Sequence, residues 1–341
     1  MNVKVTLKDV AKEAGVSYQT VSKVLRGQIK VTQDTQDRIE TAVSRLGYRP
    51  NTAARNLRTQ SSNLIGYGWL QGSSDSPHPV LNQFLYSAVQ RAELNDFHLL
   101  TFLIEEDIEN TIAIYRELHA RRQVEGFILA DTNDNDPRIR FLMEENIPFA
   151  SFGRANDAWD FGWVDVDGSD GMHQTTAHLQ EQGHTKIALI TWPEGSRAGE
   201  EREKGYFTQM AATGLTIDPE WIVRGENTVH FGYRLLNQLI ALPTGKRPTA
   251  VACVSDEIAI GAMNAALAQG LQVGSDLAVT GYDNLPMSEF LFPALTTVEQ
   301  PIQEAGSAVI EMLLKQINNQ PLLEKQVLLK PQLIIRQSSG A

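Results

Sequence analysis

The sequence predicts an α/β protein in which a small all-helical N-terminal unit precedes a larger domain with two lobes of parallel sheet. Residues 1–60 carry only helix patterns, whereas beyond residue 63 apolar runs of strand length alternate with amphipathic stretches. Such alternation predicts parallel sheets covered by helices on both faces. The alternation falls into two halves of similar length. Two lobes of this kind bind a ligand between them, at the carboxyl ends of their strands.

The composition is that of a globular protein outside the membrane. Apolar residues make up 42% of the 341 residues and charged residues 21%, which excludes a disordered chain. No uninterrupted apolar window is long enough to span a bilayer. The opening MNVKVTLKDVAKEAG carries charges every few residues, unlike a secretory signal. Cys253 is the only cysteine, so no internal disulfide is expected, and we predict a cytoplasmic protein.

The net charge of −11 is unevenly distributed along the chain. Residues 1–60 contain 11 lysines and arginines against 5 acidic residues, whereas the remaining 281 residues contain 19 against 36. A basic N-terminal unit on an acidic body indicates nucleic-acid contact by the N-terminal unit alone, because phosphates require local positive charge. Chance clustering of surface lysines is the alternative.

The N-terminal unit has the pattern of a helix-turn-helix. Thr6 begins a short amphipathic helix that ends at Gly15, and Ser17 begins a second. A third helix runs from Thr32 to a glycine stop at Gly47 and closes the small core. Two short helices joined by a glycine-containing turn are typical of a DNA-binding helix-turn-helix.

The second helix carries the side chains suited to reading bases. Tyr18, Gln19 and Lys23 lie on its exposed face, where glutamine can pair with adenine and lysine can reach guanine. Hydroxyls at helix starts suit phosphate oxygens, although they can also serve only as caps. The predicted DNA-binding residues of this unit are Thr6, Ser17, Tyr18, Gln19, Ser22, Lys23 and Thr32.

Two long segments together resemble the N-terminal region of the LacI family of bacterial transcriptional regulators. They are VTLKDVAKEAGVSYQTVSKVL and VTQDTQDRIETAVSRLGYRPNTAARNL. The resemblance implies a hinge helix at about residues 51–59 that orders on DNA, with Leu57 as a wedge in the minor groove. Asn51, Ala54 and Leu57 are the predicted DNA-binding residues of this segment. A helix this short is not expected to be stable alone in water. The alternative is a plain linker whose Leu57 packs against the body.

The resemblance extends to the C-terminal segment LLKPQLIIRQSS. It implies a body similar to periplasmic sugar-binding proteins, in which the chain crosses between the lobes three times. The predicted domains are therefore a headpiece at 1–60 and an effector-binding and dimerisation domain at 61–341. The predicted lobes are lobe 1 at 61–166 and 299–328, and lobe 2 at 167–298 and 329–341. No heptad segment follows the last predicted strand, so we expect a homodimer.

The resemblance also implies effector-binding residues in the body. Arg202 in EREKGY matches an arginine that binds effector hydroxyls, and Asp283 and Gln300 match polar residues of the cleft. Ser255 stands where many relatives have asparagine. The alternatives are a surface ion pair between Arg202 and a neighbouring glutamate, and a loop-bracing role for Asp283. We expect Asp256, which follows Ser255, to be a helix cap.

Side chains near the predicted strand ends supply further candidates. Trp69 and Trp163 can stack on sugar rings, as can Trp192 and Phe161, and Arg154 follows a strand in SFGR. The predicted effector-binding residues are Trp69, Arg154, Trp163, Arg202, Ser255, Asp283 and Gln300. These aromatic residues favour a sugar or glycoside over a small anion.

The sequence contains no catalytic or metal-binding motif: GxSxG, HExxH, CxxC and glycine-rich phosphate loops are all absent. We therefore predict no enzyme and no cofactor. A transporter-linked solute-binding protein would explain the body but leaves residues 1–60 without a role, and a sugar-processing enzyme lacks catalytic residues. The sequence thus predicts a dimeric repressor that binds a palindromic double-stranded DNA operator under the control of a carbohydrate effector.

Overall fold

The computed structural model describes all residues except 1–4, 26–28, 49–60, 71–78, 106 and 341. The chain forms two compact units, Met1–Ser62 and Asn63–Ala341. Within the described residues, no helix has both the length and the apolar character needed to cross a bilayer.

The N-terminal unit, called the headpiece, contains the three predicted helices α1 (Leu7–Ala14), α2 (Tyr18–Val24) and α3 (Gln33–Leu46). Thr6 begins α1 by donating from its backbone N–H and its hydroxyl to Asp9 Oδ2, at 2.8 and 2.7 Å. Gly15 ends this helix at φ 65°, a left-handed conformation that glycine adopts without strain. Apolar side chains of all three helices, including fully buried Val10, Val21 and Ile39, form one core.

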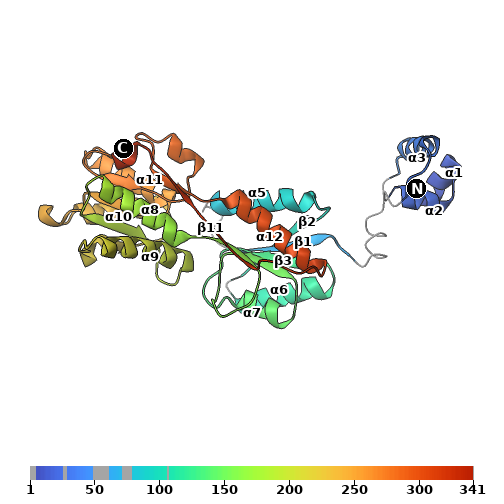
Figure 1. The fold of residues 1–341 in the computed structure, drawn as a ribbon, viewed down its shortest axis with the longest axis horizontal. Helices are drawn as coiled ribbons and strands as arrows, with labels where there is room; N and C mark the ends of the chain where they lie inside the picture. The colour runs from blue at the N-terminus through green and yellow to red at the C-terminus, as the bar shows by residue number, and fades with distance from the viewer. Residues whose placement is uncertain (1–4, 26–28, 49–60, 71–78, 106, 341) are drawn as a thin grey trace. The chain divides into compact units, whose positions relative to one another are not determined.

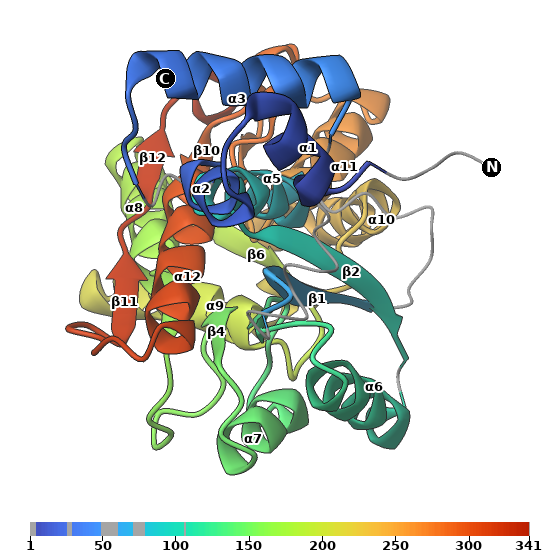
Figure 2. The same cartoon turned by 90° about the vertical axis from the view of Figure 1, so that its right-hand side faces the viewer.

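Lobe 1 of the body is a six-stranded sheet in the order β11-β5-β4-β3-β1-β2, with every neighbouring pair parallel. Its strands are β1 (Leu64–Leu70), β2 (His98–Ile104), β3 (Gly126–Leu129), β4 (Phe149–Phe152), β5 (Trp163–Val166) and β11 (Gln326–Leu329). Its helices are α5 (Pro79–Glu93), α6 (Ile108–Ala120), α7 (Pro137–Glu144) and α12 (Ile302–Ile317). Helices α5 and α12 cover one face, whereas α6 and α7 cover the other (Figures 1 and 2).

Lobe 2 is a four-stranded parallel sheet in the order β7-β6-β8-β9. Its strands are β6 (Ile187–Thr191), β7 (Ile222–Arg224), β8 (Ala250–Cys253) and β9 (Ala278–Thr280). Its helices are α8 (Gly168–Glu181), α9 (Arg197–Ala212), α10 (Val229–Ile240) and α11 (Asp256–Ala268). Short 3-10 helices lie at Pro219–Trp221, Thr244–Lys246, Pro286–Glu289 and Gln337–Ser339. Buried apolar side chains of these strands and helices form one large core.

The chain passes between the lobes at three places. It leaves lobe 1 after β5, returns after β10 (Thr297–Glu299), and leaves again after β11 to form β12 (Gln332–Ile334). Strands β10 and β12 pair antiparallel as a two-stranded sheet. This topology brings the carboxyl ends of strands from both lobes toward one another, which is where α/β sheets place ligands.

Candidate functional site

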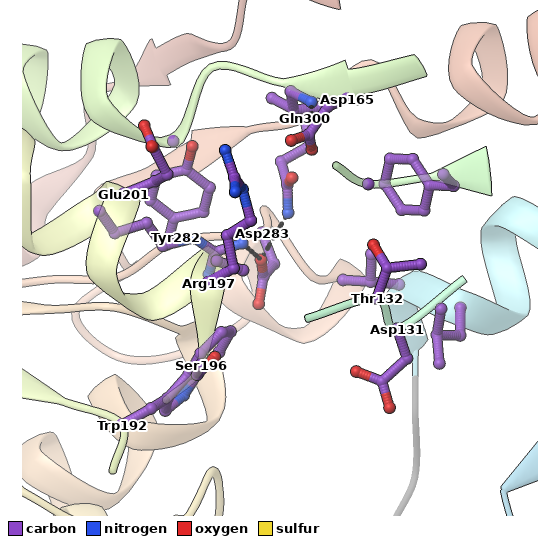
Figure 3. A pocket seen from close by; sticks show the side chains of 18 of the residues that line it. Asp131, Thr132, Asp165, Trp192, Ser196, Arg197, Glu201, Tyr282, Asp283 and Gln300 are labelled. Carbon is purple, nitrogen blue, oxygen red and sulfur yellow. Dashed lines mark hydrogen bonds and ion pairs between the residues drawn. The ribbon is translucent and has the colours of Figure 1, made fainter. Parts of the chain in front are cut away.

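A cavity of about 350 Å³ lies between the two lobes of the body. Its lining follows the carboxyl ends of parallel strands, with Asp131 after β3, Arg154 after β4, Trp192 after β6 and Asp283 after β9. In Figure 3, Asp131 and Thr132 face Trp192 and Ser196 across the cavity. Parallel strands end at one edge of each sheet, so the fold gathers side chains that are far apart in sequence.

Arg202 of α9 is the buried cation of this cavity, with its side chain 8% exposed. Its Nη1 donates to the Val254 carbonyl oxygen, and its Nη2 lies 3.5 Å from Asp283 Oδ1. The guanidinium carbon lies 3.8 Å from the centre of the Tyr282 ring and 4.9 Å from that of Trp192. Among the described residues its ion-pair partner is therefore Asp283 and not one of the glutamates of α9. Because these contacts fix the guanidinium group, its N–H donors have a defined orientation in the cavity.

Asp283 is the acceptor opposite Arg202. Its backbone has φ 115°, and Gln300 Nε2 donates to its Oδ1 at 2.7 Å. Burial raises the pKa of Asp283 to about 7, although the positive charge of Arg202 acts to lower it. Near neutral pH the carboxyl group can therefore accept a hydrogen bond when ionised and donate one when protonated.

Arg154 joins lobe 1 to this arrangement. Its Nε donates to Asp165 Oδ2 at 2.7 Å, and its Nη2 lies 3.6 Å from Glu201 Oε2 of α9. Its guanidinium carbon lies 5.7 Å from the centre of the Trp163 ring. The cavity thus receives charged groups from both lobes.

The structure brings four of the seven predicted effector-binding residues to the cavity wall: Arg154, Arg202, Asp283 and Gln300. The other three do not line it. Trp69 packs on the lobe 1 core, edge-on to Tyr67 at 5.2 Å, and Trp163 packs on the opposite core of the same lobe. Ser255 is fully buried, caps α11 by accepting from Ile258 N–H at 3.2 Å, and donates to Asn227, which does line the cavity.

Sequence reasoning did not select several side chains that line the cavity, among them Asp131, Asp165, Arg197, Glu201 and Glu257. Asp131 and Asp165 lie at strand ends, so their position along the chain could have identified them. Trp192, considered as a stacking platform, also lines the cavity. Its indole N–H is buried and has no hydrogen-bond partner within the described part of the chain. A buried free donor at a cavity wall suits a ligand acceptor.

The charges of the lining are unbalanced. Three arginines (154, 197 and 202) stand against five acidic side chains (Asp131, Asp165, Glu201, Glu257 and Asp283), of which Asp283 is partly protonated near neutral pH. Each arginine already lies within 4 Å of at least one carboxylate. The excess of acidic groups disfavours an anionic ligand.

The headpiece exposes the predicted base-reading side chains of α2. Tyr18 is 45% exposed, and Gln19 and Lys23 are exposed as well. Ser17 Oγ accepts from Thr20 N–H at 3.0 Å, so this hydroxyl already caps α2. Thr32 forms a hydrogen bond to Thr35 at 2.9 Å between their hydroxyls. Ser22 is 5% exposed and lies inside the headpiece. The hinge residues Asn51, Ala54 and Leu57 lie outside the described residues.

Known proteins similar to this chain are regulators with the same organisation. Residues 6–51 match the model of bacterial regulatory proteins of the lacI family, and residues 176–339 match a periplasmic binding protein-like domain. The HTH-type transcriptional regulator AglR of Rhizobium meliloti (strain 1021) is 33% identical, over 98% of this chain and 94% of its own length.

Two solved structures extend the similarity to three dimensions. The Lac repressor dimer bound to operator and the anti-inducer ONPF is 29% identical with a TM-score of 0.85, over 99% of this chain and all of the other. The CelR–cellobiose complex is 26% identical with a TM-score of 0.74, over 98% and 99% of the two chains. These relatives are transcriptional regulators and not enzymes, and the predicted resemblance is confirmed: the chain belongs to the LacI family of bacterial transcriptional regulators.

Proposed function

We propose that this protein is a cytoplasmic transcriptional repressor that binds a palindromic DNA operator as a homodimer. A carbohydrate effector raises or lowers its affinity for that operator. The observation that carries the proposal is the presence, in one chain, of an exposed helix-turn-helix face and an aromatic, polar cavity. The DNA-reading face is that of Tyr18, Gln19 and Lys23 on α2. The sensing site is the cavity around Arg202 and Asp283.

Two headpieces on one palindrome would place two α2 helices in major grooves about one helical turn apart, or a multiple of that distance. The Lac repressor relative is a dimer on its operator, which supports this arrangement. An effector can control DNA binding only if it binds the DNA-competent and incompetent states with different affinities. A cavity between two lobes suits this role, because a change in the angle between the lobes alters every contact across it.

The chemistry of the cavity favours an uncharged sugar. Trp192 and Phe152, both partly exposed, supply ring faces for apolar C–H patches, while Arg202, Asp283 and Gln300 supply donors and acceptors for hydroxyls. The relative CelR is known as a complex with cellobiose, a neutral disaccharide. The acidic excess of the lining opposes a uronate or phosphate, since like charges about 4 Å apart near a protein surface cost about 4 kcal/mol.

Sugar selectivity is tested by the melting temperature of the full chain with matched ligands at constant ionic strength. We expect one of cellobiose, maltose, sucrose or a methyl glucoside to stabilise the protein, by about 2.7 kcal/mol at 100 times its Kd. Glucuronate, galacturonate and glucose 6-phosphate should have no comparable effect. The double variant Asp131→Asn, Glu257→Gln removes the acidic excess. It should therefore reduce the difference in melting temperature between the protein with a neutral sugar and the protein with an acidic sugar. Stronger stabilisation by an acidic sugar would contradict this part of the proposal.

DNA recognition is tested by gel shifts on the DNA upstream of the gene, with random duplex as competitor. We expect the full chain to select a palindromic fragment. A chain that begins at Ser61 should lose specific affinity by more than about a thousandfold, because it lacks the base-reading helix. The melting behaviour of its body serves as the folding control. Equal binding by the two chains would show that the headpiece is not the DNA-binding unit.

A further inference from the structure

Two arginines, one from each lobe, reach across to carboxylates of the opposite lobe beside the cavity. Arg197, the first residue of α9 in lobe 2, forms ion pairs with Asp134 and with Asp157 of lobe 1, the latter at 2.7 Å. In the other direction, Arg154 of lobe 1 lies 3.6 Å from Glu201 of α9. We call the residues of these three interlobe pairs the interlobe clasp: Arg154, Arg197, Asp134, Asp157 and Glu201.

The local structure holds Arg197 in place for this contact. Ser196 caps α9 by accepting from Gly199 N–H at 3.3 Å, so the helix begins at Arg197. The backbone N–H of Arg197 donates to Asn133 Oδ1 of lobe 1 at 3.3 Å. Its side chain is only 13% exposed, whereas its partners Asp134 and Asp157 are 58% and 83% exposed. The side chain of a partly buried arginine whose planar guanidinium binds two carboxylates has less conformational freedom than an arginine in an ordinary surface ion pair.

The clasp acts on the helix that carries the effector-binding arginine. Arg197 and Glu201, both labelled in Figure 3, lie one turn apart on α9, and Arg202 directly follows Glu201; all three line the cavity. A rotation that separated the lobes would have to break the pairs with Asp134 and Asp157. It would also draw Arg202 away from the lobe 1 side of the cavity, where Asp131 and Asp165 lie.

We propose that Arg197 is a positioning residue that holds the two lobes closed and so sets the width of the effector cavity. Its influence on effector binding rests on the function proposed above, but its effect on the lobe arrangement does not. Removal of the clasp shifts the population toward open lobes, because the closed form loses contacts that the open form does not make.

The proposal is tested by the distance between spin labels on the two lobes in the full chain, with neither DNA nor sugar. Labels are attached at Glu144→Cys on α7 and Thr208→Cys on α9, both exposed positions. Cys253 is fully buried and should not react. Labelled chains are diluted with unlabelled chains, so that only distances within one chain contribute. We expect Arg197→Gln to lengthen and broaden the distance distribution, and Arg197→Lys to give an intermediate result.

Salt dependence separates a clasp from a general structural role. At about 1 M salt the screening length falls to about 3 Å, so the wild-type distribution should move toward that of Arg197→Gln, which itself should change little. Asp157→Asn alters only an exposed partner and should reproduce part of the shift even if the arginine variant folds poorly.

The control variant is Arg121→Gln, which removes an exposed ion pair with Glu117 near the end of α6, within lobe 1. It should leave the distances unchanged. Identical distributions for wild type and both Arg197→Gln and Asp157→Asn would overturn the proposal, as would an equal shift in Arg121→Gln. Because no DNA or sugar is present, this failure is distinct from a failure to bind either one.

Discussion

Replacement of Arg202 by alanine is expected to abolish the response to effector while operator affinity stays within about twofold of wild type. The arginine supplies charge-assisted donors to the cavity, each worth about 1.5–3 kcal/mol, so effector affinity should fall by at least about tenfold. Its position in the body, outside the headpiece, leaves base reading intact. The measurement is a titration of the sugar that stabilises the wild type, followed by gel shifts with and without that sugar.

The same substitution should change the titration of Asp283. Arg202 opposes the effect of burial on this carboxyl group, whose pKa is about 7. Without that positive charge the pKa of Asp283 should rise further, so the group should be protonated at neutral pH. Protonation of Asp283 limits the loss of folding stability that a buried, charged carboxylate without Arg202 would cause. Arg202→Ala should therefore fold at pH 7 and lose stability as the pH rises through the new pKa of Asp283, because ionisation of the buried group is then required.

Arg234→Ala is the matched control for this prediction. Arg234 lies on the exposed side of α10 in the same lobe, where its guanidinium carbon is 5.1 Å from the centre of the Phe231 ring. It does not line the cavity. This variant should keep both effector response and operator affinity. A normal sugar response in Arg202→Ala would remove the arginine from the effector site.

Replacement of Gly261 by alanine is expected to destabilise the body by about 3 kcal/mol, near the upper end of the usual range for overpacking. Helices α10 and α11 touch through their backbones at two glycines. A Cβ atom at Gly261 would lie 2.0 Å from the Val229 carbonyl oxygen, and one at Gly232 would lie 2.1 Å from that of Ile258. Both obstacles are backbone atoms of a neighbouring helix, so the helices would have to separate. Alanine gains about 1 kcal/mol over glycine in helix propensity, which is too little to offset the free-energy cost of separating the two helices.

The free energy of unfolding in chemical denaturant, followed by circular dichroism, measures this effect. Gly245→Ala is the control, because a Cβ atom there would have no heavy atom within 4 Å and the backbone φ is not in the positive range. It should change the free energy of unfolding by less than about 0.5 kcal/mol. Equal stability of the two variants would show that α10 and α11 can separate at little cost.

Some of the predicted effector-binding residues are polar side chains that follow a buried strand, and the structure places these on the cavity wall. Arg154 and Asp283 are of this kind, and both line the cavity. Trp163 shows the limit of that reasoning. It is the first residue of β5 and not the last, so it lies at the opposite end of the strand from Val166, which lines the cavity. A one-dimensional pattern locates a strand but determines its ends and its two faces less well.

Asp256 shows a second limit. The sequence predicts it as a helix cap, but Ser255 caps α11 and Asp256 is the first helical residue. The buried carboxylate accepts from Leu285 N–H at 2.7 Å and from the hydroxyls of Ser288 and Thr297, both at 2.5 Å. Burial raises the pKa of Asp256 to about 6, while these hydrogen bonds act to lower it. Its partners lie 29 to 41 residues away in the chain, so no local pattern identifies them.

The sequence by itself determined the order of helices and strands, the basic headpiece and the family, because periodicity, capping residues and local charge are properties of neighbouring residues. Only the tertiary structure decided which side chains share the cavity and which ion pairs join the lobes. Arg197 lies 63 and 40 residues from its partners Asp134 and Asp157, and nothing in its own segment indicates them. Such contacts depend on the arrangement of the two lobes, whose parallel strands present their carboxyl ends to the same cavity.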